Sequence, residues 1–446
     1  MRHWATQDVR ELPSRTRTLV VIAALGLIAA ITAAAYVIYS KFGPHHDQYD
    51  LRIYYNATSF WLSGNRLYDY WQPDPVNGTL GYTYPPAAAV LMAPMHVFGL
   101  GAVVRINFLA IIAAGAGCMF LWLSQRLTLG RLQMFTVVAV STAIAFCLQP
   151  FAQTVAFGQI NLFLALLVSI DLLVLARRGS RWTGVLVGLS IAVKLTPGIF
   201  LLYFLLRKDW RAVAVSLASC AALTLVSAVV APAESIFYFT KLLWQSDRVG
   251  LLDNTTNQSI NGLVARLSPD GMPDTLVWLV LSLILLAVAA PRIRRAISFG
   301  NTLTAVVLTG LLGLLVSPVT WIHHAIWFVP ATYLMADHLW RERPRIAAGE
   351  SSARFPDSTA ARAWLATLFL TMAGLWIFFK DTRVFFGLPD TGYAGLGPIA
   401  QIEGSLQLLW MAATLLLLPI RTPCATGPDL PATTGMIGAR RSVGRP

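Results

Sequence analysis

The sequence predicts an all-α polytopic membrane protein. Of its 446 residues, 56% are hydrophobic and 12% are charged, and the mean hydropathy is +0.62. These values lie far outside the range of soluble proteins. Apolar runs long enough to cross a bilayer, which takes about 20 residues each, recur along the chain. They begin near residues 19, 102, 133, 158, 212, 276, 302, 321, 361 and 405.

Two further apolar runs are shorter or broken. Residues 85–98 open with Pro85-Pro86, and residues 183–206 are interrupted by Lys194 and Pro197. Helices of this kind usually line a cavity inside a membrane protein. We therefore expect 85–98 to dip into the membrane and out again, and 183–206 to form a hairpin of two half-helices. With the longer runs, this makes about twelve transmembrane or half-spanning helices.

The ends of the chain are predicted to lie in the cytoplasm. Residues 1–18 form a basic segment before the first apolar run, 19–39, which is long enough to span and has no small-residue cleavage site. We expect it to stay as an anchor and not to be removed as a signal peptide. The membrane domain then covers 19–420, and the Pro-, Gly- and Thr-rich tail 421–446 is expected to be disordered. The four cysteines are scattered and indicate packing residues.

The distribution of charge predicts which loops face outward. With the N-terminus inside, most of the 34 Lys and Arg residues fall on the cytoplasmic side, as the positive-inside rule requires. The net charge of +13 is then a topology signal and an attraction to anionic lipid, so no nucleic-acid partner is needed. The polar segments on the outer face are 40–84 (first external loop), 150–157, 233–275 (second external loop), 317–324 and 380–404. We expect the function to lie there.

An acidic residue opens the first of these segments. Asp50 begins the stretch DLRIYYNATSFWLSG, whose apolar and aromatic residues follow helical spacing up to Gly64. The pattern predicts an amphipathic helix in the membrane interface, with Asp50 at its N-terminus and at headgroup depth. The alternative is an ordinary solvated loop acid. Asp47 is a second candidate three residues earlier.

Aromatic and amide side chains follow at other breaks between apolar runs. Tyr84 precedes the Pro pair, which fits the first turn of a short helix; such aromatics either stack on sugar or belong to the interfacial belt. Gln159 and Asn161 interrupt apolar sequence, as do Gln149 and Gln153. Such amides either hydrogen-bond between helices or bind ligand hydroxyl groups.

Cationic side chains suggest a phosphate site. A lysine within an apolar run, such as Lys194, costs roughly 3 kcal/mol to insert, and a bound phosphate would offset that cost; snorkelling or pairing with Asp171 is the alternative. The loop 246–267 offers Asn257, Gln258 and Arg266, which suit a polyhydroxyl and a phosphate, although a solvated loop explains them as well. His323 and His324 lie about 100° apart on a helix and make a poor metal pair. We expect one to reach the cavity and the other to pack; a purely structural pair is the alternative.

Taken together, these segments resemble the actinobacterial GT-C superfamily of polyprenol-phosphate-sugar-dependent glycosyltransferases. The resemblance is strongest to the α-(1→2)-mannosyltransferases of phosphatidylinositol mannoside and lipomannan biosynthesis. It covers about residues 47–335. The residues that carry it are Asp50 to Tyr54, Leu67-Tyr68, Tyr84-Pro85-Pro86, Gly158 to Asn161, Lys194 with Pro197, Asn257 to Ser259 with Gly262 and Arg266, and Ser317-Pro318 with Trp321, His323 and His324.

The resemblance implies a GT-C type fold of about twelve spans in the plasma (inner) membrane, with the active site on the extracytoplasmic face. It also implies a single carboxylate acting as base, here Asp50, and inversion of a β-mannosyl phosphopolyprenol donor to an α-mannoside. Superfamily members with paired acids differ, because Leu51 follows Asp50. On this basis Lys194, Arg266, His323 and His324 are expected around the donor phosphate. Tyr54, Tyr84, Gln159, Asn161, Asn257 and Gln258 are expected to bind sugar or acceptor.

The expected chemistry requires no nucleotide-binding loop, because a polyprenyl phosphate is already a good leaving group. The site must supply a base for the acceptor hydroxyl and donors for the departing phosphate. Protein cations can neutralise that phosphate, so we predict no metal and no cofactor. The expected partners are a polyprenyl-phosphate-mannose donor, a phosphatidylinositol mannoside or lipomannan acceptor, and the bilayer. An arabinofuranosyltransferase of the same superfamily, or a transporter of isoprenoid lipid or sugar, remains the alternative.

Overall fold

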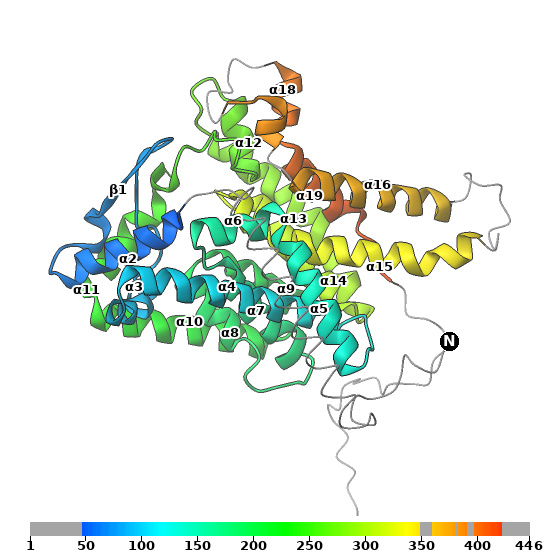
Figure 1. Cartoon of the computed structure of the whole chain (residues 1–446), viewed down its shortest axis with the longest axis horizontal. Coiled ribbons are helices and arrows are strands. Elements are labelled where there is room, and N and C mark those ends of the chain that lie inside the picture. The colour runs from blue at the N-terminus through cyan, green and yellow to red at the C-terminus, as the bar shows by residue number, and fades with distance from the viewer. Residues whose placement is uncertain (1–46, 246, 348–358, 380–381, 390–396, 422–446) are drawn as a thin grey trace, which may run out of the picture.

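The computed structural model of the protein describes residues 47–245, 247–347, 359–379, 382–389 and 397–421. Within them the chain is mostly helical (Figure 1). The predicted N-terminal anchor 19–39 and the tail beyond 421 lie outside the described residues. Every other apolar run named above contains a helix.

The helices are, in chain order, α2 (Tyr49–Leu62), α3 (Pro86–Met92), α4 (Leu100–Leu123), α5 (Arg131–Phe146), α6 (Gln149–Phe157), α7 (Asn161–Ile170), α8 (Val185–Val193), α9 (Phe200–Arg207), α10 (Trp210–Val230), α11 (Pro232–Thr240), α12 (Ile260–Leu267), α13 (Thr275–Ser298), α14 (Thr302–Val316), α15 (Phe328–Ala347), α16 (Thr359–Phe379), α17 (Thr382–Phe386), α18 (Pro398–Glu403) and α19 (Leu406–Leu417). Short 3₁₀ turns lie at η2 (Leu67–Asp69), η3 (Ala93–Val97), η5 (Thr196–Ile199), η6 (Leu242–Trp244), η7 (Asp247–Val249) and η8 (Ile322–His324), and η4 (Asp171–Leu175) is a π-helical turn.

Four helices in the described residues are long and apolar enough to cross a membrane: α4, α10, α13 and α16. The pair α5 and α6 makes a fifth if it counts as one span, although it is bent by 74°. Little of α10 and α13 is buried inside the protein, because their leucine and valine side chains face outward. The protein is therefore a helical membrane protein, while the expected number of about twelve spans stays a prediction.

The centre of the molecule is built from shorter helices. α14 has 15 residues and is buried on nearly all sides, and at about 1.5 Å per residue it is roughly 22 Å long, shorter than a bilayer's apolar core of about 30 Å. α7, α8 and α9 are shorter still. Their apolar side chains join those of α4, α14 and α15 in one continuous core. These short helices leave polar chain breaks inside the membrane domain.

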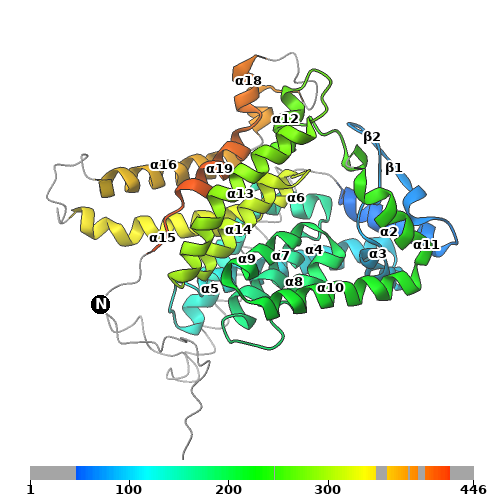
Figure 2. The same cartoon turned by 180° about the vertical axis from the view of Figure 1, so that it is seen from behind.

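The segment 183–206 forms the predicted hairpin. Arg207 at the end of α9 donates to the carbonyl of Ala176, and Arg211 donates to that of Ser180, so both ends of the segment meet. Lys194 follows α8 directly in extended conformation and lies at the turn. α8 packs closely against α10, which leads to α11 beside α3 (Figure 2).

The first external loop contains more than the expected helix. α2 begins at Tyr49 as predicted, but two short antiparallel strands, β1 (Trp71–Asp74) and β2 (Gly78–Gly81), pair between Trp71 and Gly81. The turn sequence Asp-Pro-Val-Asn-Gly is typical of a hairpin, and the all-α prediction missed it. The Tyr49 hydroxyl donates to the carbonyl of Pro73 at 2.7 Å. The hairpin therefore fixes the start of α2.

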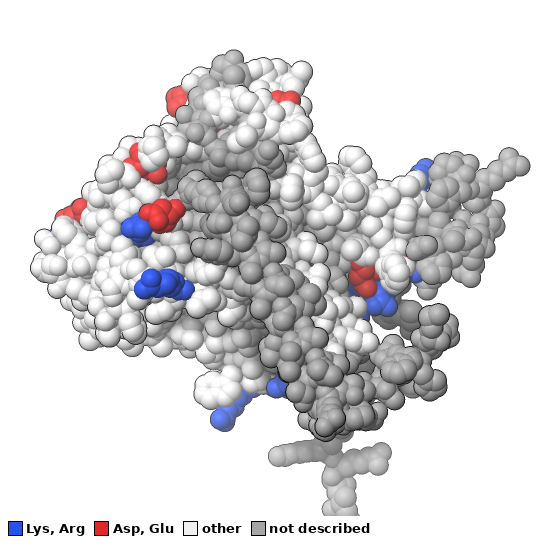
Figure 3. Space-filling model, in the orientation of Figure 1, with Lys and Arg blue, Asp and Glu red and all other residues white. Residues whose placement is uncertain are grey.

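Charged side chains are distributed unevenly over the surface. On the face shown in Figure 3, most of the acidic side chains lie toward the end of the molecule that carries β1, α12 and α18. Basic side chains are visible both at that end and at the opposite end. The acidic end is the one that the sequence predicts to be extracytoplasmic.

Candidate active site

Asp50 lies in the first turn of α2, where the helix dipole favours a carboxylate. The backbone N–H of Gln48 donates to the carbonyl of Ala156 at 2.8 Å, so the start of α2 is held against α6. Asp47 points elsewhere. It pairs with Arg52 at 2.7 Å and its side chain is 83% exposed, so Asp50 is the acid that faces the interior.

A glycine lets the next element approach Asp50. Gly158 ends α6 with φ +70°, and a Cβ there would lie 2.6 Å from the Cβ of Leu51. Glycine meets both requirements, the left-handed backbone and the close contact. The turn delivers the following residue, Gln159, whose Nε2 donates to Oδ2 of Asp50 at 2.5 Å.

Two buried tyrosines continue this contact into the protein. The hydroxyl of Tyr84 donates to Oε1 of Gln159 at 2.9 Å and lies 2.8 Å from the hydroxyl of Tyr54. Tyr84 stands just before α3 and Tyr54 lies on α2, so the first external loop supplies both. Their hydroxyl groups are engaged with each other and with Gln159, which differs from the direct sugar contacts that we expected.

Lys194 lies at the other end of this network. Its Nζ is 3.0 Å from Oδ1 of Asn161, 3.1 Å from Nε2 of His324 and 3.3 Å from the hydroxyl of Tyr84, and it also lies 5.0 Å from the centre of the Tyr84 ring. Lys194 is 8% exposed. The alternative pairing with Asp171 is wrong, because that carboxylate accepts from the backbone N–H groups of Gly184 and Val187.

The two adjacent histidines have different surroundings. His324 reaches Lys194, whereas the ring of His323 packs against Phe157 at 5.3 Å. The two rings are nearly perpendicular. His323 contributes its backbone carbonyl, which accepts from Nδ2 of Asn161 at 3.0 Å. The sequence left open which histidine faces the cavity, and the structure selects His324.

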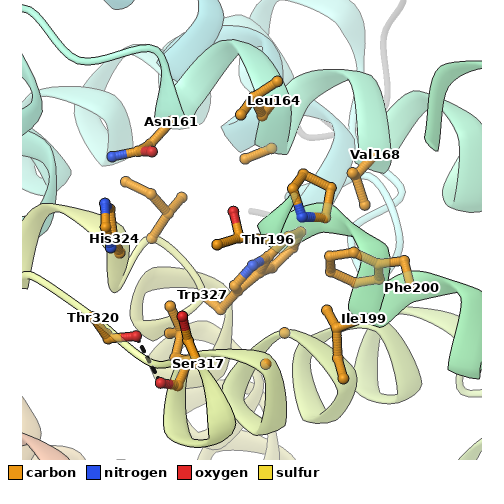
Figure 4. A pocket seen from close by; sticks show the side chains of 16 residues that line it. Asn161, Leu164, Val168, Thr196, Ile199, Phe200, Ser317, Thr320, His324 and Trp327 are labelled. Carbon is orange, nitrogen blue, oxygen red and sulfur yellow. Dashed lines mark hydrogen bonds between the residues drawn. The ribbon is translucent and has the colours of Figure 1, made fainter. Parts of the chain in front are cut away.

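A cavity of about 70 Å³ begins beside this cluster (Figure 4). Asn161 and His324 face each other at one end, and Leu164, Val168 and Phe200 line the other. The walls come from α7, the η5–α9 segment, α14 and the chain that precedes α15. The cavity is polar where Asn161 and His324, the partners of Lys194, line it and apolar at Leu164, Val168 and Phe200. Thr196, Ser317 and Thr320 add further polar groups to the lining.

Burial governs the ionisation of Asp50. Desolvation raises the pKa of its carboxyl from 3.8 to about 6, although the hydrogen bond from Gln159 and the charge of Lys194 act in the opposite direction. At neutral pH the carboxylate is ionised, and its raised pKa makes it a better proton acceptor than an ordinary aspartate. A single hydrogen-bond network thus connects a carboxylate of raised pKa to a buried lysine beside the cavity.

Comparisons with known proteins show the family of this chain. A model of glycosyltransferase family 87 matches residues 82–318, which is more than half of the chain. The chain belongs to glycosyltransferase family 87. The match contains Tyr84, Gln159, Asn161 and Lys194, and the resemblance seen in the sequence is confirmed.

The chain is similar to several mannosyltransferases. It is 36% identical over 350 residues, 75% of this chain and 80% of the relative, to the polyprenol-phosphate-mannose-dependent alpha-(1-2)-phosphatidylinositol mannoside mannosyltransferase of Mycobacterium tuberculosis. It is 36% identical over 286 residues, 63% of this chain and 67% of the relative, to the corresponding phosphatidylinositol pentamannoside mannosyltransferase of Mycolicibacterium smegmatis. A phosphatidylinositol mannoside mannosyltransferase of the same organism is 32% identical over 315 residues, 66% of this chain and 71% of the relative.

In the second external loop of this family-87 protein, the predicted site residues have hydrogen-bond partners inside the protein. Asn257 and Gln258 are buried, and their amides are used inside the protein. Nδ2 of Asn257 donates to the carbonyl of Leu252 while its Oδ1 accepts from the backbone of Thr320. Gln258 bridges the carbonyl of Gly404 and the backbone N–H of Leu408. These hydrogen bonds hold the loop in place, and sugar binding by the two amides stays a prediction.

Arg266 also has its partners inside the protein. It is 0% exposed, and its guanidinium donates to the carbonyls of Asn254 and Asn257 and to Oγ of Ser405. It ties α12 and its loop to the turn before α19. These contacts hold Arg266 within the second external loop and against Ser405, and its expected role at the donor phosphate stays a prediction.

The sequence did not predict the partners of Gln159 and Asn161. The sequence indicated a polar break at Gly158-Gln159-Ile160-Asn161 but assigned both amides to sugar. In the structure each amide binds a charged side chain, Gln159 to Asp50 and Asn161 to Lys194. Among the described residues, no three His, Cys, Asp or Glu side chains are grouped to hold a metal ion; independence from metal stays a prediction.

Proposed function

We propose that this chain transfers mannose from a polyprenyl-phosphate-mannose donor to a hydroxyl of a phosphatidylinositol mannoside or lipomannan acceptor, forming an α-1,2 linkage. The relatives named above are all mannosyltransferases with this donor in their names, which favours mannose over arabinofuranose and an enzyme over a transporter. The observation that carries the proposal is the network that joins Asp50 to Lys194 beside a half-polar, half-apolar cavity.

The cationic end of the network suits the donor's phosphate. The backbone N–H of Trp321 donates to Nδ1 of His324 at 3.2 Å, so Nε2 carries the hydrogen of the neutral ring. Nε2 and the ammonium of Lys194, 3.1 Å apart, then both present hydrogens, and a phosphate oxygen bound to both would stabilise that arrangement. The apolar part of the cavity would take the first isoprene units of the lipid.

The proposed reaction uses Asp50 at one end of the network and Lys194 with His324 at the other. An acceptor hydroxyl gives its proton to Asp50, and its oxygen attacks the anomeric carbon on the face opposite the phosphate. The bond between that carbon and the phosphate oxygen breaks, and the electron pair leaves with the polyprenyl phosphate, which thereby gains one negative charge. Lys194 and His324 stabilise the new charge. A single displacement inverts the anomeric centre, so a β-linked donor gives an α-linked product.

Orientation in the membrane belongs to the same proposal. The acidic end of the molecule carries α2, the hairpin and the second external loop, and the positive-inside rule places that end outside. The reaction would then occur on the extracytoplasmic face of the plasma membrane. Both substrates are lipids, so each can reach the site within the outer leaflet.

The test uses purified full-length protein with mannosyl-phosphopolyprenol and a phosphatidylinositol mannoside. The wild type should extend the acceptor by one hexose, and Asp50→Asn should reduce turnover by about 10³-fold, within the range lost with a general base plus its charge. The matched control is Asp47→Asn, which removes an exposed carboxylate just before α2 and should keep turnover within about twofold. Full activity of Asp50→Asn would overturn the assignment of the base.

A further inference from the structure

The hydrogen bonds between Asp50 and Lys194 use nearly all the capacity of the groups that join them. The hydroxyl of Tyr84 has one hydrogen and two lone pairs. It donates to Gln159, accepts from Lys194 at 3.3 Å, and lies 2.8 Å from the hydroxyl of Tyr54, which must then be the donor. The hydroxyl of Tyr84 therefore has no free position left for a sugar.

The hydrogen bonds that join Lys194 to Asp50 run in a fixed direction. An ammonium can only donate, so the oxygen of Tyr84 accepts from Lys194 and its hydrogen points onward to Oε1 of Gln159. Because that oxygen of the amide is occupied, its nitrogen faces Asp50, where it donates to Oδ2. An amide N–H binds an ionised carboxylate more strongly than the carbonyl oxygen of a protonated one, so this hydrogen bond favours the ionised form. Within the described residues, Oδ1 of Asp50 accepts no hydrogen bond.

We propose that Gln159 and Tyr84 are positioning residues, which hold Asp50 in its ionised form and leave its Oδ1 open to the acceptor hydroxyl. This inference rests on the proposed role of Asp50 as the base. This series of hydrogen bonds starts at Lys194. The lysine at the phosphate end therefore also influences the protonation of Asp50. Gly158 and the turn after α6 supply the geometry, and burial of Tyr84, which is 7% exposed, keeps water out of the chain.

The readout is the pH dependence of kcat/KM, because it reports the base of the free enzyme. Removing the amide with Gln159→Met should move the acid limb of the profile upward by about one pH unit and lower the plateau about tenfold, since a hydrogen bond to a charged group is lost. The other groups that act on the charge of Asp50 stay in place: Lys194, Asp74, Tyr49, Tyr54 and Tyr84. On the same helix, Arg52 remains paired with Asp47.

Three comparisons separate a positioning role from a merely structural one. Gln149→Met is the matched control, because Gln149 is an equally buried amide on α6 that bonds to Gln407; its acid limb should not move. Gln159→Glu keeps the shape but places a second carboxyl beside Asp50, and the acid limb should move upward by about two pH units or more. Tyr84→Phe should give a smaller upward shift, and combining it with Gln159→Met should add nothing, since both cut the same chain.

The outcomes distinguish this inference from the proposed function. If Asp50→Asn abolishes transfer but both Gln159 variants keep the wild-type acid limb, Asp50 remains the base and the positioning role is wrong. Additive effects of Gln159→Met and Tyr84→Phe would also overturn it. If Asp50→Asn is fully active, the proposed function of the carboxylate fails first.

Discussion

Replacing Lys194 with methionine tests the phosphate end of the site. Among the described residues Lys194 forms no ion pair with a carboxylate, and the groups nearest its Nζ are the neutral side chains of Tyr84, Asn161 and His324. A buried ammonium with neutral partners is expensive to desolvate. Removing Lys194 leaves one acceptor on Asn161 and one on Tyr84 without a donor, which costs about 1 kcal/mol of stability each. This cost is offset because the desolvation penalty of the buried ammonium is also removed.

We therefore expect Lys194→Met to separate stability from activity. The free energy of unfolding should change by no more than about 1 kcal/mol, whereas kcat should fall by about 10² to 10³, the usual effect of losing one donor to a developing anion. Mannosyl transfer and thermal unfolding are measured on the same detergent preparation. Lys208→Met, at an exposed lysine just after α9, is the control and should change neither. Transfer within threefold of wild type, or a loss of activity that merely follows unfolding, would refute the reasoning.

Two further substitutions test how the site is assembled. Gly158→Ala should lower activity at least tenfold and lower the melting temperature, because the new Cβ meets Leu51 and pushes α2 from α6; Gly64→Ala, at φ +94° with open space around it, isolates the backbone strain of about 1 kcal/mol and should leave kcat unchanged. His324→Leu should weaken inhibition by polyprenyl phosphate and reduce kcat/KM about 10- to 100-fold through the lost hydrogen bond to phosphate. His323→Leu, beside Phe157, should alter mainly stability, and equal kinetic effects of the two histidine variants would contradict the assignment.

The helices and the polar groups of the site were predictable because their signals are local. Apolar length indicated the helices, Pro85-Pro86 indicated a short helix, and a lysine inside an apolar run indicated a site at Lys194 whatever the fold. Asp50 was predictable from its place at the start of an amphipathic helix. Each of these inferences uses neighbours in the sequence only.

What the sequence did not predict depends on tertiary contacts. Arg266, Asn257 and Gln258 have the composition of a sugar or phosphate site, yet the loop folds so that backbone carbonyls and amides take up their hydrogen bonds. Equally, nothing in the sequence indicates that Gln159 meets Asp50 across 109 positions. The selection of His324 over His323 follows from the 3₁₀ turn at η8, which the helical spacing did not specify.

The most direct test of the whole account is a structure of the Asp50→Asn variant with the mannosyl-phosphopolyprenol donor and a phosphatidylinositol mannoside bound together. The account predicts the acceptor hydroxyl within about 3 Å of the side chain at position 50, and the donor phosphate in hydrogen-bond contact with Lys194 Nζ and His324 Nε2 with its lipid entering the cavity beside Leu164. A phosphate bound away from Lys194, or an acceptor hydroxyl that approaches the sugar from a side remote from position 50, would contradict it.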